Sequence, residues 1–283
     1  MPELPEVETI ARGLQKRIAG DVVQSVWLGK KPEIYKSKPQ EIVEVLHGAH
    51  IKKVRRVGKH IVFDLELLAR KKTKKDGARH GQWIVHLGMT GKVQVVDPNV
   101  EEERHTHSIL RLASGRELRF VDPRRFGRLA VVVQDSKASE GFRAPGDEPL
   151  DSQIDRFMEL FRGRKTPIKS ALLNQKLLSG VGNIYADEAL FRARIRPRRR
   201  AASLTRNELV RLHAAVKEVL REAIALGGSS VNDYVDADGN EGFFQLQHRV
   251  YGREGEPCLV CRTPVKRIVI AGRSSHYCRH CQS

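Results

Sequence analysis

The sequence opens with the stretch Met1-Pro2-Glu3-Leu4-Pro5-Glu6-Val7-Glu8-Thr9, in which a helical apolar pattern begins. From Pro5 to about Ile18 the apolar residues recur at the spacing of an amphipathic helix. Acidic residues fall in its first turn and basic residues in its last, as the helix dipole favours. The sequence therefore predicts a helix that starts almost at the chain terminus.

The second residue of this stretch suggests chemistry. Pro2 is small enough for an aminopeptidase to remove Met1, which would expose a secondary amine. The pKa of an α-amino group is roughly 7.7–8.0, so a useful fraction of it carries no proton near neutral pH. Such an amine can form a Schiff base, and the neighbouring Glu3 can donate or accept protons. The structural alternative is an ordinary chain end, with acidic residues that only favour the helix.

Residues 21 to about 135 are expected to form strands. Ser114-Gly115 is a turn signal between two of the later strands. The prediction depends on short segments rich in β-branched residues, which are 22–28, 61–65, 83–87, 92–96 and 129–133. Strands this short and frequent favour a sandwich or barrel over alternating βαβ units. Polar composition between Gln134 and Pro149 then predicts a linker, placed at 136–150.

A helical part is expected after this linker. An apolar stripe covers 154–161, and Thr166 followed by Pro167 is interpreted as an N-cap with proline at the first helical position. Asn183 is interpreted as the cap of a helix over 184–193. A capping box predicts one more helix, which ends at Gly227-Gly228; the box runs from Thr205 to Glu208.

All four cysteines of the chain lie near its end, as Cys258-x2-Cys261 and Cys278-x2-Cys281. Four thiolates at this spacing match one tetrahedral zinc ion and leave no open position for water, so its role would be structural. A ribbon this small needs metal to hold its fold. Disulfides are the alternative, but nothing in the sequence indicates secretion.

The charge balance points to a polyanionic partner. The chain has 51 basic and 34 acidic residues, a formal net charge of +17. The segment 69–80 contributes five of these charges and is interpreted as a solvated surface loop. No membrane-spanning run or signal peptide is evident, so we expect a cytoplasmic protein without a membrane partner.

Five separated motifs resemble those of the formamidopyrimidine-DNA glycosylases, bacterial enzymes that excise oxidised purines from DNA. They are the opening Met1–Thr9, the turn His86-Leu87-Gly88-Met89-Thr90-Gly91, the turn Asp122-Pro123-Arg124-Arg125-Phe126-Gly127, the four-cysteine finger, and one helix–two-turn–helix motif made of the two segments Lys165-Thr166-Pro167-Ile168-Lys169 and Gly180-Val181-Gly182-Asn183-Ile184-Tyr185-Ala186. The resemblance covers nearly the full length. It implies an α+β fold: an N-terminal β-sandwich with a leading helix over 1–135, a helical domain with a helix–two-turn–helix motif over 151–242, and a zinc-finger β-hairpin over 243–283.

The resemblance also implies roles for single residues. Pro2 would be the nucleophile and Glu3 the proton-transfer group, with Lys59 and Arg273 assisting the elimination steps. Met89, Arg124 and Phe126 would fill the space that a flipped nucleotide leaves; taken singly, Met is more often core filling and Asp-Pro with arginines a solvated turn. DNA contacts would come from His105, Arg124, Lys165, Asn183 and Tyr185.

Together these features predict a monomeric glycosylase and abasic-site lyase that acts on damaged duplex DNA through β,δ-elimination, in the cytoplasm at the bacterial nucleoid. One alternative is an endonuclease VIII-like glycosylase for oxidised pyrimidines, and another is a zinc-ribbon DNA-binding protein without catalysis. The sequence departs from the family pattern in the basic segment 69–80 and at Asn232, in the 227–242 loop, where relatives tend to carry a basic residue. Since this loop covers the damaged base in the family, base preference is the point it affects.

Overall fold

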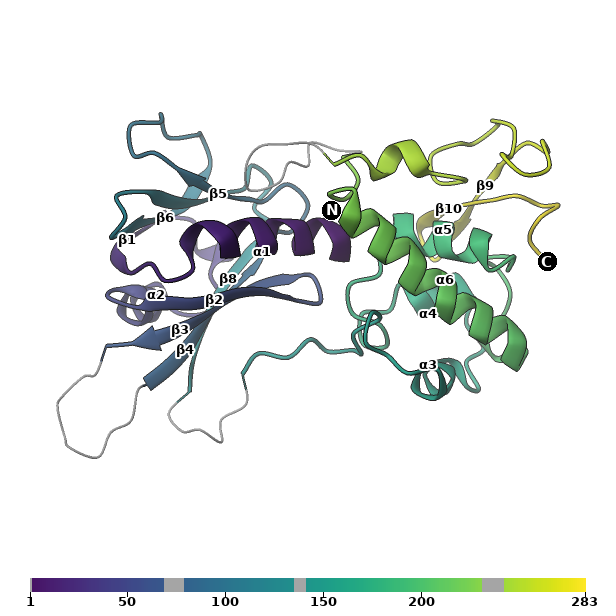
Figure 1. The fold of residues 1–283 in the computed structure, drawn as a ribbon, viewed down its shortest axis with the longest axis horizontal. Coiled ribbons are helices and arrows are strands. Elements are labelled where there is room, and N and C mark those ends of the chain that lie inside the picture. The colour runs from purple at the N-terminus through teal and green to yellow at the C-terminus, as the bar shows by residue number, and fades with distance from the viewer. Residues whose placement is uncertain (1, 69–78, 135–140, 231–241) are drawn as a thin grey trace. The chain divides into compact units, whose positions relative to one another are not determined.

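The computed structural model describes residues 2–68, 79–134, 141–230 and 242–283, and the chain divides into two compact units (Figure 1). The first unit is built mainly from Glu6–Arg143, and the second from Glu3–Pro5, Ala144–Ser229 and Phe243–Ser283. The division at 143/144 falls inside the stretch predicted as a linker. Most of the basic segment 69–80 lies outside the described residues, as does Asn232.

Two four-stranded antiparallel sheets form the first unit. One sheet has the strand order β2-β3-β4-β8, with bounds His50–Val57, His60–Leu67, Arg79–His86 and Arg128–Gln134. The other has the order β1-β6-β7-β5, with bounds Val23–Leu28, Thr106–Leu112, Glu117–Val121 and Lys92–Val96.

The two sheets and helix α1 (Leu4–Ile18, purple in Figure 1) share one hydrophobic core. Phe63 and Trp83 come from one sheet and Phe120 from the other, and all three are fully buried. The apolar stripe of α1 from Val7 to Ile18 joins the same core, because its members recur on one helical face. The expected sandwich with a leading helix is confirmed.

The expectation of strands alone between 21 and 135 is wrong at two places. A 3₁₀ turn, η1, covers Pro32–Ile34, and helix α2 covers Pro39–Leu46. Pro39 stands at the first helical position, where its fixed φ suits a helix, and Ile42, Val45 and Leu46 are buried at helical spacing. A segment of only eight residues is too short for its helical periodicity to be recognised in the sequence.

Helices are the main regular elements of the second unit. The bounds are α3 Ile154–Phe161, α4 Ile168–Leu172, α5 Asn183–Arg192 and α6 Arg206–Ala225, with 3₁₀ turns η2 Ala201–Ser203 and η3 Phe244–Gln247. The predicted capping box of α6 is confirmed, because Glu208 N–H donates to Thr205 Oγ1 at 3.3 Å while Thr205 N–H donates to the Glu208 carboxylate at 2.8 Å. No helix in the described ranges is long and apolar enough to cross a membrane.

Two predicted caps are displaced by one residue. The N-cap of α4 is Pro167, not Thr166, because Pro167 has a non-helical ψ of 140° and pairs with Arg200 in an isolated bridge. The N-cap of α5 is Gly182, so Asn183 is already the first helical residue and the helix ends at Arg192. Neither N-cap residue has a side chain that can accept a hydrogen bond from the helix.

The chain ends in a hairpin of β9 (Lys266–Ile270) and β10 (Arg273–Tyr277). Beside it, Cys258 and Cys278 form a small core with Phe191, Val250 and Val265. Glu188, which is fully buried in α5, accepts hydrogen bonds of 2.9–3.1 Å from the amides of Arg249–Tyr251. These contacts attach the finger to the helical core of the same unit.

Candidate functional site

In the first unit, two turns carry the side chains predicted to replace an extruded nucleotide in the duplex. The fully buried side chain of Asp122 links these two turns. One carboxylate oxygen accepts from Thr90 Oγ1 at 2.6 Å and from Arg124 N–H at 3.2 Å, and the other accepts from Gly127 N–H at 2.7 Å. A Cβ on Gly88, whose φ is +67°, would lie 2.5 Å from Gly127 N. Only glycine therefore lets the two turns approach this closely.

The side chains carried by these turns are exposed. Met89 is 40% and Phe126 47% exposed, both unusual for large apolar residues, and the Arg124 guanidinium carbon lies 4.9 Å from the Phe126 ring centroid. His105, which is also exposed, has a φ of +74° and accepts a backbone hydrogen bond from Asp122 N–H at 3.1 Å. The structure thus brings four predicted DNA-facing residues to one corner of the sandwich.

Lys59 lies in the turn between β2 and β3 and is 7% exposed. Its neighbour His60 packs against His86 with ring centroids 4.9 Å apart, and His86 Nδ1 accepts from Gly88 N–H at 3.1 Å, at the start of the Met89 turn. Burial, reinforced by the positive charges of His60 and Lys59, lowers the pKa of His86 to about 4. Burial also lowers the pKa of His60. Both imidazoles near Lys59 therefore hold a proton less readily than a free histidine does.

In the second unit, Glu3 supplies the cap that Gly182 lacks. Glu3 is 5% exposed, and its Oε1 accepts from Ile184 N–H, in the first turn of α5, at 3.3 Å. A Cβ on Gly182 would fall on the Glu3 carboxyl group. Leu4 N–H also donates to Gly180 O at 3.0 Å, so the backbone next to Glu3 is anchored. The positive end of the α5 dipole therefore faces a carboxylate that is fixed in place.

A buried ion pair lies close to this carboxylate. Lys169 and Asp187 are both fully buried, with Nζ and Oδ1 2.6 Å apart. Burial lowers the pKa of Lys169, while the charges of Asp187 and Glu3 act in the opposite direction. The other Asp187 oxygen accepts from His276 N–H at 2.8 Å.

The same pair fixes the start of β10. Lys169 Nζ donates to Ser274 O at 2.5 Å, and Asn183 Nδ2 donates to Ser274 Oγ at 3.2 Å. Arg273, which is exposed, directly precedes Ser274 and contributes a repulsive charge to Lys169. Glu3, Asn183 and Arg273 are thus brought together in the second unit.

The remaining two predicted contacts differ. Lys165 is exposed, as a phosphate-binding residue should be. Tyr185 is 1% exposed, and its ring centroid lies 5.5 Å from that of Phe244 in the helical core. The Tyr185 ring is therefore occupied by packing, and a DNA contact of this residue stays a prediction.

The four cysteines form a metal site. Their Sγ atoms lie within 4.8 Å of one another, with Cys258 and Cys281 3.9 Å apart and Cys261 and Cys278 3.4 Å apart. Zn–S bonds of about 2.3 Å in a tetrahedron place sulfurs about 3.8 Å apart, whereas a disulfide requires about 2.05 Å. The donor set therefore fits one structural zinc ion. Amides at Val260 and Cys281 donate to the cysteine sulfurs at 3.5 Å and favour thiolates.

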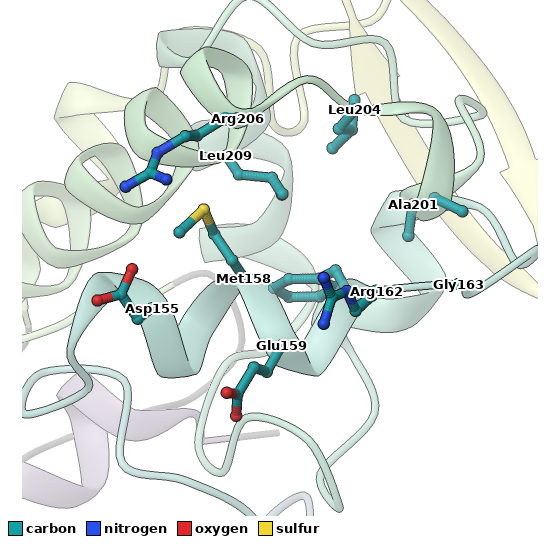
Figure 2. Close-up of a pocket in the computed structure, with 11 residues that line it drawn as sticks. Asp155, Met158, Glu159, Arg162, Gly163, Ala201, Leu204, Arg206 and Leu209 are labelled. Carbon is teal, nitrogen blue, oxygen red and sulfur yellow. The ribbon is translucent and has the colours of Figure 1, made fainter.

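A hollow of about 430 Å³ is present elsewhere in the second unit, between α3, η2 and the start of α6 (Figure 2). Met158 and Leu209 line it together with Asp155, Arg162 and Arg206. None of the predicted site residues lines this hollow.

Comparison with known proteins assigns these features to one family. Sequence profiles of the formamidopyrimidine-DNA glycosylase N-terminal domain, of its H2TH domain and of the zinc finger found in FPG and IleRS match residues 1–129, 145–235 and 255–283. The chain belongs to the formamidopyrimidine-DNA glycosylase family. The formamidopyrimidine-DNA glycosylase of Desulforamulus reducens is 42% identical over 100% of this chain and 99% of its own.

Solved structures of this glycosylase family agree. The MutM (FPG) protein of Thermus thermophilus is 41% identical with a TM-score of 0.82, covering 99% of this chain and 98% of its own. A Lactococcus lactis FPG variant in complex with Fapy-dG-containing DNA is 32% identical with a TM-score of 0.85 and full coverage of both chains. Wild-type L. lactis FPG, 33% identical, also with a TM-score of 0.85 and full coverage of both chains, was solved with DNA that contains an oxidised pyrimidine.

Sequence reasoning missed two buried residues that hold predicted site residues in place, Asp122 in the first unit and Lys169 in the second. Asp122 follows β7, all of whose residues are buried, and precedes a proline, so a buried turn with an acceptor could have been inferred. Lys169 stands between Ile168 and the buried pair Ala171 and Leu172, where an apolar residue is expected. A charged residue at such a position indicates a buried partner.

Proposed function

We propose that this protein excises oxidised purines, 8-oxoguanine and ring-opened formamidopyrimidines, from duplex DNA and then cleaves the abasic site. The observation that carries the proposal is the Glu3 carboxylate, fixed at the N-terminus of α5 in a space that only Gly182 leaves open. A buried carboxylate one peptide bond from a terminal amine is a proton-transfer group next to a nucleophile. The family assignment supplies the substrate class, and we place the enzyme in the bacterial cytoplasm as a monomer.

The Pro2 nitrogen, freed by removal of Met1, attacks C1′ of the extruded nucleotide in this proposal. The N–C1′ bond forms as the glycosidic bond breaks, and the base leaves with the bonding electron pair and takes a proton from solvent. The Glu3 carboxylate accepts the proton of the attached Pro2 nitrogen and passes it to the ring oxygen of the sugar as the ring opens, which leaves an iminium ion. Glu3 is suited to this step because the amide of Ile184 holds its carboxylate in one orientation.

The iminium ion then accepts the electron pair of the C2′–H bond when that proton is removed. The 3′ phosphate leaves in the β-elimination and the 5′ phosphate in the δ-elimination, so the strand is cut on both sides. Lys59, held beside His60 and His86, and Arg273, at the start of β10, assist these departures. The zinc ion stabilises the finger and takes no part in the chemistry.

Met89, Arg124 and Phe126 act before this chemistry. A base inside a duplex is out of reach of a nucleophile, so the nucleotide has to be extruded and the gap filled. Two apolar side chains at high exposure, with an arginine lying over one of them, suit that gap. Arg124 can in addition donate to the base left without a partner.

Borohydride trapping on a duplex with one 8-oxoguanine tests the mechanism. We expect an adduct whose peptide map places the sugar on Pro2, loss of trapping when an N-terminal extension blocks the amine, and a strong decrease in Glu3→Gln. The control is Glu41→Gln, which changes an exposed glutamate of α2. An adduct on Lys59, or no adduct with the wild-type protein, contradicts the mechanism.

One observation favours a second substrate class. The L. lactis relative was solved with DNA that contains an oxidised pyrimidine. We therefore propose that oxidised pyrimidines are accepted as weaker substrates. A panel of duplexes that each carry one lesion would measure this, and faster release of a damaged pyrimidine than of 8-oxoguanine would reverse the order.

A further inference from the structure

The second unit contains a two-stranded ribbon that the reaction described above does not use. Residues 164–168 run antiparallel to residues 197–202, which belong to the arginine-rich stretch Arg196-Pro197-Arg198-Arg199-Arg200. The backbone bonds are Ile168 N–H to Arg199 O at 2.7 Å, Ala201 N–H to Thr166 O at 3.0 Å and Ala202 N–H to Arg164 O at 2.8 Å. The arginine-rich stretch is therefore held beside Lys165.

The four arginines of this stretch fall into two classes. Arg196 donates to the carbonyl of Gln282 at 2.8 Å, and Arg199 pairs with Glu208, so both serve the fold. Arg198 and Arg200 are exposed, and no hydrogen bond or ion pair in the described part of the chain engages their side chains. Two permanently charged guanidinium groups are thus left to solvent.

Backbone pairing places one of these arginines near Lys165. Pro167 and Arg200 form an isolated antiparallel bridge, and opposed residues of such a pair share a face. Lys165 lies two residues before Pro167 and is exposed, as Arg200 is. Arg198 stands in the turn that leads into the same strand.

We propose that Lys165, Arg198 and Arg200 form one edge that binds backbone phosphates of duplex DNA, and that Arg198 and Arg200 extend the site beyond the Lys165 motif. Guanidinium groups match phosphate oxygens in bidentate geometry, and the basic chain as a whole suits the phosphate backbone of a nucleic acid. The contact would be independent of base sequence. The inference rests on the DNA-binding function proposed above.

The test is the salt dependence of binding to an undamaged duplex. Each phosphate contact contributes about 0.9 to the slope of log K against log salt, so Arg198→Gln/Arg200→Gln should lower the slope by about 1.8. The control Lys16→Gln/Arg221→Gln removes the same charge from exposed helix positions and should keep the wild-type slope. Circular dichroism and zinc content verify that both variants are folded.

A slope equal to that of the wild type overturns the proposal, and this is also the result expected if the ribbon serves an acidic protein partner. An equal decrease in the control overturns it too, because the effect would then be one of net charge. Borohydride trapping by the wild-type protein separates the two proposals. If the wild type traps its substrate while the slope stays unchanged, only the phosphate-binding edge is wrong.

Discussion

Replacing Asp122 with asparagine keeps the shape of the side chain and removes one acceptor. The carboxylate accepts three hydrogen bonds, from Thr90, Arg124 and Gly127, through its two oxygens. An amide can retain the first two through its single oxygen, but its NH₂ group then faces the Gly127 N–H. The buried N–H of Gly127 is left without an acceptor.

The loss of one hydrogen bond to a charged acceptor costs about 1.5–3 kcal/mol. A domain with about 5–15 kcal/mol of stability survives this, so the fold should persist while the two turns separate more often. At about 1.4 kcal/mol per factor of ten, the ordered arrangement of Met89, Arg124 and Phe126 should become roughly tenfold to a hundredfold less favoured.

Cleavage of an abasic site in a duplex and in a single strand distinguishes this effect from general damage. Only the duplex has a gap to fill, so we expect the ratio of duplex to single-strand cleavage rates to fall about tenfold or more in Asp122→Asn. The matched control is Asp97→Asn, an exposed turn carboxylate that accepts from Asn99 N–H at 2.9 Å. A ratio within about twofold of the wild type, in a folded variant, would refute the role of Asp122.

Three further predictions follow from the site. Gly182→Ala places a methyl group on the Glu3 carboxyl group and should lower the rate of single-turnover excision about a hundredfold. The control Gly29→Ala, where the nearest atoms lie at an ordinary 3.5 Å, should excise at the wild-type rate. If Gly182→Ala also excised at the wild-type rate, the fixed position of Glu3 would be disproved. Removal of zinc by a chelator should unfold the β9–β10 hairpin, seen as loss of its amide protection, and added zinc should restore it; a hairpin that stays protected without metal would contradict the structural role. The pKa of His86 is lowered to about 4 from about 6.5, so the unfolded chain takes up the proton first and the free energy of unfolding should decline by about 3 kcal/mol as pH falls from about 6.5 to about 4. Urea denaturation at both pH values should show a smaller decline in His86→Asn, and an equal decline would exclude His86 as its source.

Features with a local signature were predictable from the sequence. The stripe of α1, the capping box of α6 and the paired cysteines each depend on residues close together in the chain, and the structure contains all three. The α2 helix was missed because eight residues give only two turns of periodicity. The caps of α4 and α5 were displaced because their partners are distant: Arg200 pairs with Pro167, and Glu3 caps α5 across 181 residues of sequence.

The missed parts of the site have the same cause. The role of Asp122 depends on its contacts with Thr90 and Gly127, which only the folded chain shows. The role of Lys169 depends in the same way on its ion pair with Asp187. The burial of the Tyr185 ring was not predictable for a similar reason. Its ring is committed to Phe244, a contact that the motif alone does not encode.

The attachment of the terminal hairpin bears on attempts to transplant it. The four thiolates are self-contained and would travel with residues 255–283 into a chimera. The hydrogen bonds that attach the hairpin would be lost. The Ser274 carbonyl accepts from Lys169 and the His276 amide donates to Asp187, and both partners belong to the helices of this protein. A grafted hairpin would bind metal, but its orientation on the new protein would not be fixed unless that protein were given a lysine and an aspartate at the same positions.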